Sequence, residues 1–193
     1  MNKVCLLFFA ISFFSCSRPT YKNPHVIITT GVGDIEVELF PDKAPKTVTA
    51  FLSYVEEGLY NNTSFYRVVK ADEMPTDFNS GIIQGGIYGS DAEKTAVKKP
   101  VDHESTKISG LSHTDGIISL ASVGAGTATT EFFICIGDQS FLDEGRGGTK
   151  DDLGFAAFGK VFKGMDIVRK IQNKNSVGDR FEKKINIQRI EKL

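Results

Sequence analysis

The chain of 193 residues has no tryptophan and only three cysteines and three histidines. The cysteines form no CxxC motif and cannot supply the disulfide framework of a small secreted scaffold. The histidines lack the spacing of a metal-binding motif such as HExxH, so no metal site is indicated. Cys135 lies in an apolar run at positions 132–136, and we expect its thiol to be buried and unreactive.

The chain also lacks an excess of charge of either sign. It has 23 Lys and Arg residues against 24 Asp and Glu residues, a net charge of −1. A protein that neutralises a phosphate backbone needs a basic surplus, so we expect no nucleic-acid partner. The glycines complete neither GxGxxG nor GxxxxGK[ST], and no serine lies in a GxSxG turn. Nucleotide binding and serine hydrolysis of that type are therefore not indicated.

The one long apolar run stands at the start of the chain. Lys3 precedes an apolar run of eleven residues at positions 4–14, interrupted only by Ser12. The run is too short for a helix to span a bilayer but is typical of a secretory signal peptide. Ser15 and Cys16 follow, and this stretch resembles a bacterial lipobox, although Phe13 stands where leucine is usual. An ordinary signal peptide with an incidental cysteine is the alternative.

This pattern predicts three parts of the chain. Residues 1–15 are a signal peptide, residues 16–23 are a short tether lipidated at Cys16, and residues 24–193 are the folded domain. The lipid would anchor the domain to a membrane of the cell envelope, most simply on the periplasmic side. The sequence does not distinguish the inner membrane from the outer membrane.

The whole sequence is 40% apolar and 24% charged, typical of one globular domain. Alternating or β-branched apolar segments predict strands near residues 26–30, 34–39, 64–69, 82–84, 116–121, 131–136, 155–161 and 185–190. One helix is predicted to begin at Pro45 and to be closed by Gly58, and another to cover 165–171. Many strands, two helices and no alternation of strand and helix favour a mainly β, closed antiparallel barrel.

Six segments together resemble the cyclophilin-type peptidyl-prolyl cis-trans isomerases. They are Phe65-Tyr66-Arg67-Val68, Ile82-Ile83-Gln84-Gly85-Gly86, the stretch 116–122, Glu131-Phe132-Phe133-Ile134, Phe141-Leu142-Asp143 and Phe158-Gly159-Lys160-Val161. The resemblance runs from about His25 to the end of the chain. It implies an eight-stranded antiparallel barrel capped by two α-helices and rotation about X–Pro peptide bonds. It also implies Pro-containing polypeptide substrates, a monomer, and no cofactor or metal.

The resemblance assigns roles to single residues. Arg67 matches the family's catalytic arginine, and Gln84 would orient it and bind substrate. Phe133 would form the floor of the proline pocket, with Ile82 and Leu142 as its walls. The remaining expected substrate contacts are Ala121, Ser122, Glu131 and Phe141.

The chain departs from the family pattern at several of these places. Tyr66 stands where many members have histidine, and no role is inferred for it. Glu131 replaces a common glutamine, and we expect it to be anionic and either to accept hydrogen bonds from substrate or to pair with Arg67. Ser122 replaces asparagine and Phe141 replaces tryptophan. The alternative to an active isomerase is therefore a catalytically weak module or chaperone that binds Pro-containing segments on the same frame.

Two segments are longer than in short members of the family. The first lies within residues 70–81, where Phe78 is expected to fold back toward the pocket. The second covers residues 144–154, directly after Phe141 and Leu142. Because long loops beside a groove often select substrates, this second loop is either a specificity element or a passive surface loop.

Overall fold

The computed structural model describes residues 21–71, 79–88, 90 and 98–193. The predicted signal peptide, Cys16 and Phe78 lie outside the described residues. The strands are β1 (His25–Thr30), β2 (Asp34–Leu39), β3 (Thr63–Lys70), β4 (Gly81–Gly86), β5 (Ile117–Leu120), β6 (Phe132–Ile136), β7 (Ala156–Lys163), β8 (Ser176–Val177) and β9 (Arg180–Lys192). The helices are α1 (Pro45–Glu56), α3 (Thr106–Ser109), α4 (Met165–Gln172) and the 3₁₀ turn η1 (Ser140–Leu142).

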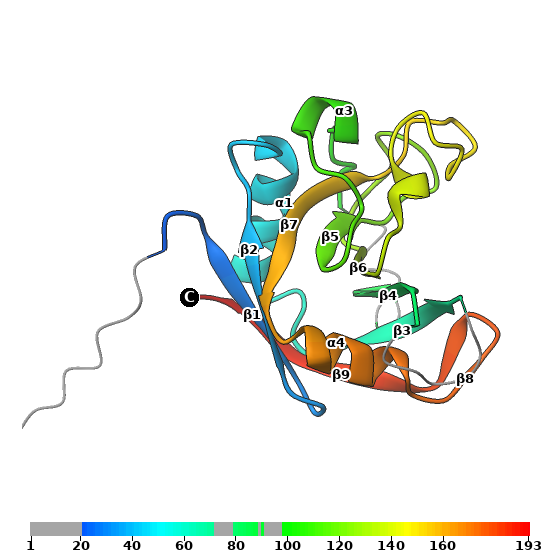
Figure 1. Cartoon of the computed structure of the whole chain (residues 1–193). Coiled ribbons are helices and arrows are strands. Elements are labelled where there is room, and N and C mark those ends of the chain that lie inside the picture. The colour runs from blue at the N-terminus through cyan, green and yellow to red at the C-terminus, as the bar shows by residue number, and fades with distance from the viewer. Residues whose placement is uncertain (1–20, 72–78, 89, 91–97) are drawn as a thin grey trace, which may run out of the picture.

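The predicted closed antiparallel barrel is confirmed. The sheet runs in the order β1-β2-β7-β5-β6-β4-β3-β9-β8, and β1 also pairs with β9. That last pairing closes eight strands into a ring, and all the pairings are antiparallel. The two residues of β8 only extend β9 into a hairpin outside the ring (Figure 1).

The two predicted helices close the barrel. Contacts of α1 reach β7 and β9, which are not neighbours in the ring. Those of α4 reach β2 as well as β3, β4 and β6, which lie on another part of the ring. A helix that contacts such strands must lie across an opening of the barrel. Phe51 of α1 and Ile171 of α4 belong to the same buried core cluster, so both helices contribute to one core. The one-turn helix α3 beside β7 was not predicted, because four residues are too few for a periodic pattern.

Strand alternation divides the apolar side chains between two clusters. On β6, Phe132, Ile134 and Ile136 point into the barrel core, whereas Phe133 and Cys135 join a second apolar cluster. Because successive side chains of a strand face opposite sides, the second cluster lies outside the barrel wall. Cys135 is free and buried as expected, and burial raises the pKa of its thiol.

A β-bulge in β3 breaks this alternation at one place. Phe65 pairs with Gly85 and Arg67 pairs with Gln84, which are consecutive residues on β4. Tyr66 is therefore an extra residue without a partner in this pairing. Phe65 and Val68 both belong to the barrel core. Tyr66 and Arg67, consecutive in sequence, therefore both face the outside of the barrel, as a bulge permits.

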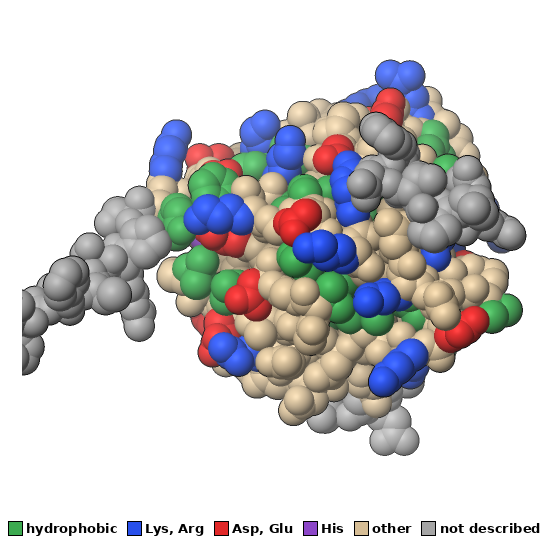
Figure 2. Space-filling view, turned by 60° about the horizontal axis from the view of Figure 1, so that its bottom comes forward, with side chains coloured by type: hydrophobic (Ala, Val, Ile, Leu, Met, Phe, Trp, Pro, Cys, Tyr) green, Lys and Arg blue, Asp and Glu red, His purple; other side chains and the backbone are tan. Residues whose placement is uncertain are grey.

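The surface shown in Figure 2 carries lysine and arginine side chains interspersed with aspartate and glutamate side chains. This mixture agrees with the near-zero net charge of the chain. In the part of the chain that the structure describes, no helix is long and apolar enough to cross a membrane.

Candidate active site

A groove of about 610 Å³ lies on the outer side of β3, β4 and β6. All nine residues predicted to catalyse or bind substrate line it: Arg67, Ile82, Gln84, Ala121, Ser122, Glu131, Phe133, Phe141 and Leu142. They come from five separate stretches of the sequence, and the barrel brings them to one surface. The predicted residues are thus assembled as one site.

The floor of the groove is aromatic and apolar. Phe133 is buried, and the ring of Phe155 stands edge-on to it with a centroid separation of 5.2 Å. Ile82 and Leu142 belong to the same apolar cluster and line the groove beside Phe133. An apolar pocket with an aromatic floor suits a pyrrolidine ring. Phe155, which follows the loop of residues 144–154, was not predicted.

A polar array supports this floor from below. His113 stacks on Phe133 at 5.8 Å, its Nδ1 lies 2.6 Å from Oδ1 of Asp143, and its Nε2 lies 3.1 Å from Oγ of Ser119. His113 and Ser119 are fully buried, so this Ser-His-Asp arrangement cannot present a nucleophile to a substrate. Burial lowers the pKa of His113 against the opposing effect of Asp143. The array therefore fixes the position of Phe133.

Two side chains hold the guanidinium of Arg67. Its Nε donates to Oδ2 of Asp179 at 2.7 Å, and its Nη1 donates to Oε1 of Gln84 at 3.0 Å. The Arg67 side chain is 34% exposed. Among the described residues these bonds use two of the five N–H donors of a guanidinium, and the others are available to a ligand in the groove. Gln84 thus lies where it can orient Arg67.

Glu131 has other partners than the expected arginine. Its Oε2 accepts from the hydroxyl of Tyr66 at 2.8 Å, and its Oε1 accepts from the backbone N–H of Tyr88 at 2.8 Å and from Thr130 Oγ1 at 3.1 Å. The residue is buried at the edge of the groove. Burial raises the pKa of Glu131, although the hydrogen bonds from Tyr88, Tyr66 and Thr130 oppose this. Its oxygens are engaged within the protein rather than presented to Arg67.

The loop of residues 144–154 forms part of the groove wall through Gly148. A Cβ at Gly148 would lie 2.2 Å from the carbonyl oxygen of Phe141, so only glycine permits this close approach. Asp151 Oδ2 accepts from the backbone N–H of Ala125 at 2.8 Å, which ties the loop to the opposite side of the groove. The loop therefore contributes to the wall of the groove, and its role in substrate selection stays a prediction.

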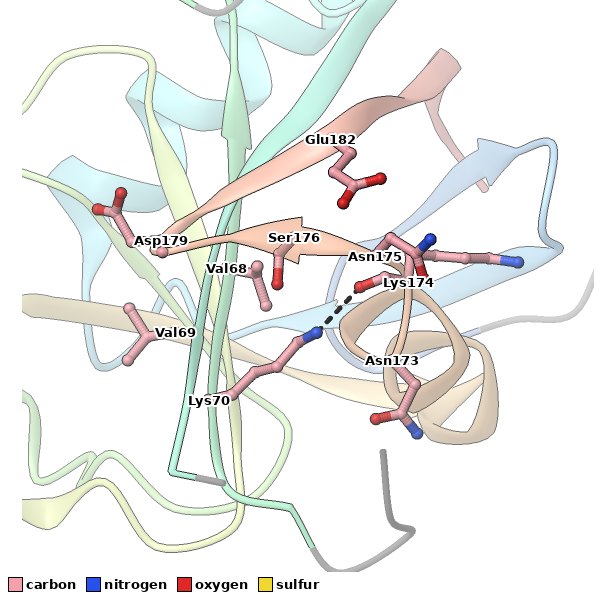
Figure 3. A pocket seen from close by; sticks show the side chains of 10 residues that line it. Val68, Val69, Lys70, Asn173, Lys174, Asn175, Ser176, Asp179 and Glu182 are labelled. Atoms are coloured by element: carbon pink, nitrogen blue, oxygen red, sulfur yellow. Dashed lines mark hydrogen bonds between the residues drawn. The ribbon is translucent and has the colours of Figure 1, made fainter. Parts of the chain in front are cut away.

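A second cavity of about 540 Å³ lies between β3 and the segment that joins α4 to β9. Lys70 Nζ donates to the backbone oxygen of Lys174 across it at 2.9 Å (Figure 3). Asp179, in the β8–β9 turn, lines this cavity and also binds Arg67. The hairpin is therefore shared by the cavity and the groove.

The family model that matches the chain is described as "Cyclophilin type peptidyl-prolyl cis-trans isomerase/CLD", and it covers residues 25–192. The chain belongs to this family. Cyclophilins are isomerases of prolyl peptide bonds, and the chain is one of these enzymes. In the residues that the structure describes, no group of three or more His, Cys, Asp or Glu side chains could hold a metal ion.

Known peptidyl-prolyl isomerases are similar to this chain in sequence and in fold. The chain is 37% identical to peptidyl-prolyl cis-trans isomerase A of Dickeya dadantii over 84% of this chain and 78% of that protein. It is 38% identical to isomerase B of Escherichia coli over 76% of this chain and 83% of that protein. A crystal structure of a cyclophilin-type isomerase of Cryptosporidium parvum in the presence of the dipeptide Ala-Pro matches with a TM-score of 0.67. It is 27% identical over 86% of this chain and 97% of that chain.

Several groove residues of this cyclophilin were not predicted from its sequence. Besides Phe155 and Gly148, they are Tyr66, Val69, Tyr88, Val123, Thr127, Thr129, Gln139 and Arg180. The most informative is Tyr66, because its departure from the family pattern was noted without a role. The bulge that brings Tyr66 into the groove left no signal in the sequence.

Proposed function

We propose that this cyclophilin accelerates cis/trans exchange of X–Pro bonds in the groove, with Arg67 as the catalytic residue. The prolyl amide loses about 18–20 kcal/mol of resonance when it twists. No bond is broken, so neither a nucleophile nor a titrating base is needed. The observation that carries the proposal is the guanidinium of Arg67, held by Asp179 and Gln84 beside the apolar floor of Phe133.

The groove residues have different roles in binding and catalysis. The proline ring packs on Phe133 between Ile82 and Leu142, while Ala121 and Ser122 contact the substrate backbone. As the amide twists, the proline nitrogen becomes pyramidal and regains a lone pair. An N–H of Arg67 donates to that lone pair and stabilises the twisted amide more than either planar isomer.

The test compares two arginine variants of the full chain, purified in detergent. Exchange NMR of an X–Pro peptide measures the catalysed rate. Arg67→Ala is expected to lose about 10²-fold or more of the catalysed rate, the cost of removing one donor to a transition state. Arg189→Ala, which removes an exposed arginine paired with Glu191 on β9, should leave the rate unchanged.

Three results are informative. Loss of catalysis in Arg67→Ala alone supports the proposed role. Full activity in Arg67→Ala contradicts it. Peptide binding without acceleration by the parent protein would favour the alternative of a binding module and would direct attention to Glu131 and Phe141.

We further propose that the enzyme works on exported proteins as a monomeric, lipid-anchored protein of the cell envelope. The support is the N-terminal sequence, in which an apolar run of eleven residues ends just before Ser15 and Cys16. Substrates would then be Pro-containing polypeptides that fold close to the membrane.

A further inference from the structure

A chain of three hydrogen bonds joins Arg67 to Glu131. Arg67 Nη1 donates to Gln84 Oε1 at 3.0 Å, Gln84 Nε2 donates to the hydroxyl of Tyr66 at 2.9 Å, and that hydroxyl donates to Glu131 Oε2 at 2.8 Å. Every donor in the chain points away from Arg67 and toward the carboxylate. Hydrogen bonds aligned in one direction polarise one another and strengthen the chain.

The carboxylate sets the direction of this chain. An ionised Glu131 can only accept, so the Tyr66 hydroxyl must donate to it. The hydroxyl oxygen then has a lone pair for an N–H of Gln84, and the amide of Gln84 is held with its oxygen toward Arg67. With the amide turned by 180°, its NH₂ group would face the guanidinium and no bond could form.

Glu131 is itself held in place. The N–H of Tyr88 and the hydroxyl of Thr130 bind its Oε1. Gly86 leaves the room that the carboxylate occupies, since a Cβ at Gly86 would lie 2.5 Å from Oε2 of Glu131. The site around the carboxylate is thus built by the end of β4, the residues after it and the start of β6.

We propose that Tyr66 and Glu131 are positioning residues, which fix the amide of Gln84 and through it the guanidinium of Arg67. The two residues are both departures from the family pattern, and they bind each other. This inference rests on the proposed role of Arg67. Neither residue needs to touch the substrate for the effect.

The mechanism makes catalysis sensitive to the protonation of Glu131. A protonated carboxyl can donate to Tyr66, which frees the hydroxyl to donate to Gln84 and lets the amide turn. The titratable and charged groups that face Glu131 or its partner are Tyr66 on β3, Tyr60 before β3, Tyr88 after β4 and Arg180 of β9. The Tyr88 ring centre lies 6.3 Å from that of Tyr66, and the Arg180 guanidinium lies 5.6 Å from the Tyr66 ring centre. Burial raises the pKa values of the Tyr60 and Tyr66 hydroxyls above the ordinary value of about 10, so neither hydroxyl loses its proton between pH 4 and 8.

The experiment uses Tyr66→Phe and Glu131→Gln in the full chain. Tyr66→Phe keeps the aromatic ring and removes the hydroxyl that connects Gln84 to Glu131. In Glu131→Gln the amide nitrogen can face Tyr66 and reverse the direction of the chain. Each variant is expected to lose about tenfold in kcat, with KM changed by less than about twofold, because the proline pocket is intact and only the guanidinium is misplaced.

The pH profile separates positioning from a merely structural role. The wild-type rate should fall as the pH is lowered through the raised pKa of Glu131, and both variants should lack this acid limb. The double variant should be no slower than the slower single variant, because both changes cut the same chain. Additive losses, or an acid limb that persists in Glu131→Gln, would overturn the proposal.

The matched control is Tyr60→Phe. The Tyr60 hydroxyl donates to the backbone oxygen of Thr130 at 2.9 Å and is fully buried, so its removal also costs a buried hydrogen bond. The control should lower stability without changing kcat or the pH profile. If Tyr60→Phe and Tyr66→Phe change the rate equally, the role of Tyr66 is structural and the proposal is wrong.

An NMR measurement without substrate tests the positioning of Arg67 separately from its catalytic role. The Arg67 Nε–H resonance, assigned from its loss in Arg67→Ala, should shift or broaden in Tyr66→Phe but not in Tyr60→Phe. An unchanged resonance in Tyr66→Phe overturns the positioning role. Full activity of Arg67→Ala, by contrast, would contradict the catalytic role of Arg67. The Nε–H resonance would still show whether the hydrogen-bond chain to Glu131 positions the Arg67 side chain.

Discussion

His113 is a buried histidine whose ring nitrogens lie within hydrogen-bond distance of Asp143 and Ser119. Burial lowers its pKa in the folded state, whereas an unfolded chain has an ordinary value of about 6.5. The unfolded chain therefore takes up a proton first as the pH falls. Folded stability is present above about pH 6.5 and is lost as the pH falls from there toward the lowered folded value.

Urea unfolding at pH 7.5 and pH 5.5 tests this at the scale of one residue. The free energy of unfolding of the wild type should be smaller at pH 5.5, by up to about 1.4 kcal/mol per pH unit. His113→Gln should be less stable at pH 7.5 by about 1–3 kcal/mol, because Asp143 and Ser119 lose a buried partner, and should depend less on pH. A pH dependence of His113→Gln as large as that of the wild type would contradict the prediction, because Glu131, whose pKa burial raises, titrates in both proteins. The Asp143 carboxyl does not contribute to this pH dependence, because its pKa lies below the pH range that is compared. Burial would raise the pKa of its carboxyl, but hydrogen bonds from Ser112 and His113 hold that pKa below its usual range.

At the scale of an element, the β8–β9 hairpin reaches back to the groove. Its turn residues are Gly178 and Asp179, and Val177 pairs with Arg180 across them. Gly178 has φ +55°, a conformation that glycine adopts without strain. The turn places Asp179 against Arg67, and the hydrogen bond from Arg67 holds the pKa of the Asp179 carboxyl below its usual range.

Asp179→Asn tests whether the hairpin orients Arg67. The pair is largely exposed, with side-chain exposures of 34% and 50%, so its loss should change the free energy of unfolding by less than about 1 kcal/mol. The catalytic efficiency kcat/KM should nevertheless fall by about threefold, because the guanidinium loses one of its two supports. Asp166→Asn, which removes the exposed pair with Lys170 on α4, is the control. Unchanged kcat/KM in Asp179→Asn would show that Gln84 suffices.

At the scale of the whole molecule, the first described residues pack on the barrel. The Tyr21 ring stacks on His25 with centroids 3.7 Å apart, and Asn23 Nδ2 donates to Glu38 Oε1 at 2.8 Å. The C-terminus lies at the same end, where the N–H of Leu193 donates to the oxygen of His25. Only four residues, 17–20, would then lie between a lipidated Cys16 and Tyr21, and the five chain steps reach about 17 Å when extended.

Membrane fractionation of cells tests the proposed anchor. Wild type should sediment with membranes and Cys16→Ser should not, because a mature lipoprotein is held by its acyl chains. Cys5→Ser is the matched control, since Cys5 lies in the segment predicted to be removed and its loss should leave sedimentation unchanged. A Cys16→Ser protein that still sediments would show that another part of the chain holds the membrane.

Local sequence patterns predict the strands of the barrel and the two longer helices. Alternation at Asp34–Leu39 and the apolar run at Phe132–Ile136 are local signals, and the structure has strands at both. The family segments also led to all nine predicted groove residues, because motifs such as Ile82-Ile83-Gln84 keep their order along the chain.

The hydrogen-bond partners of the groove residues, in contrast, depend on the tertiary structure. Tyr66 faces Glu131 because a bulge adds one residue to β3, and a bulge depends on pairing between strands rather than on local sequence. Asp179 lies more than a hundred residues from Arg67 in sequence, and the hairpin that joins them is positioned by closure of the sheet. Local patterns report burial and secondary structure, whereas hydrogen-bond partners follow from how distant segments meet in the folded barrel.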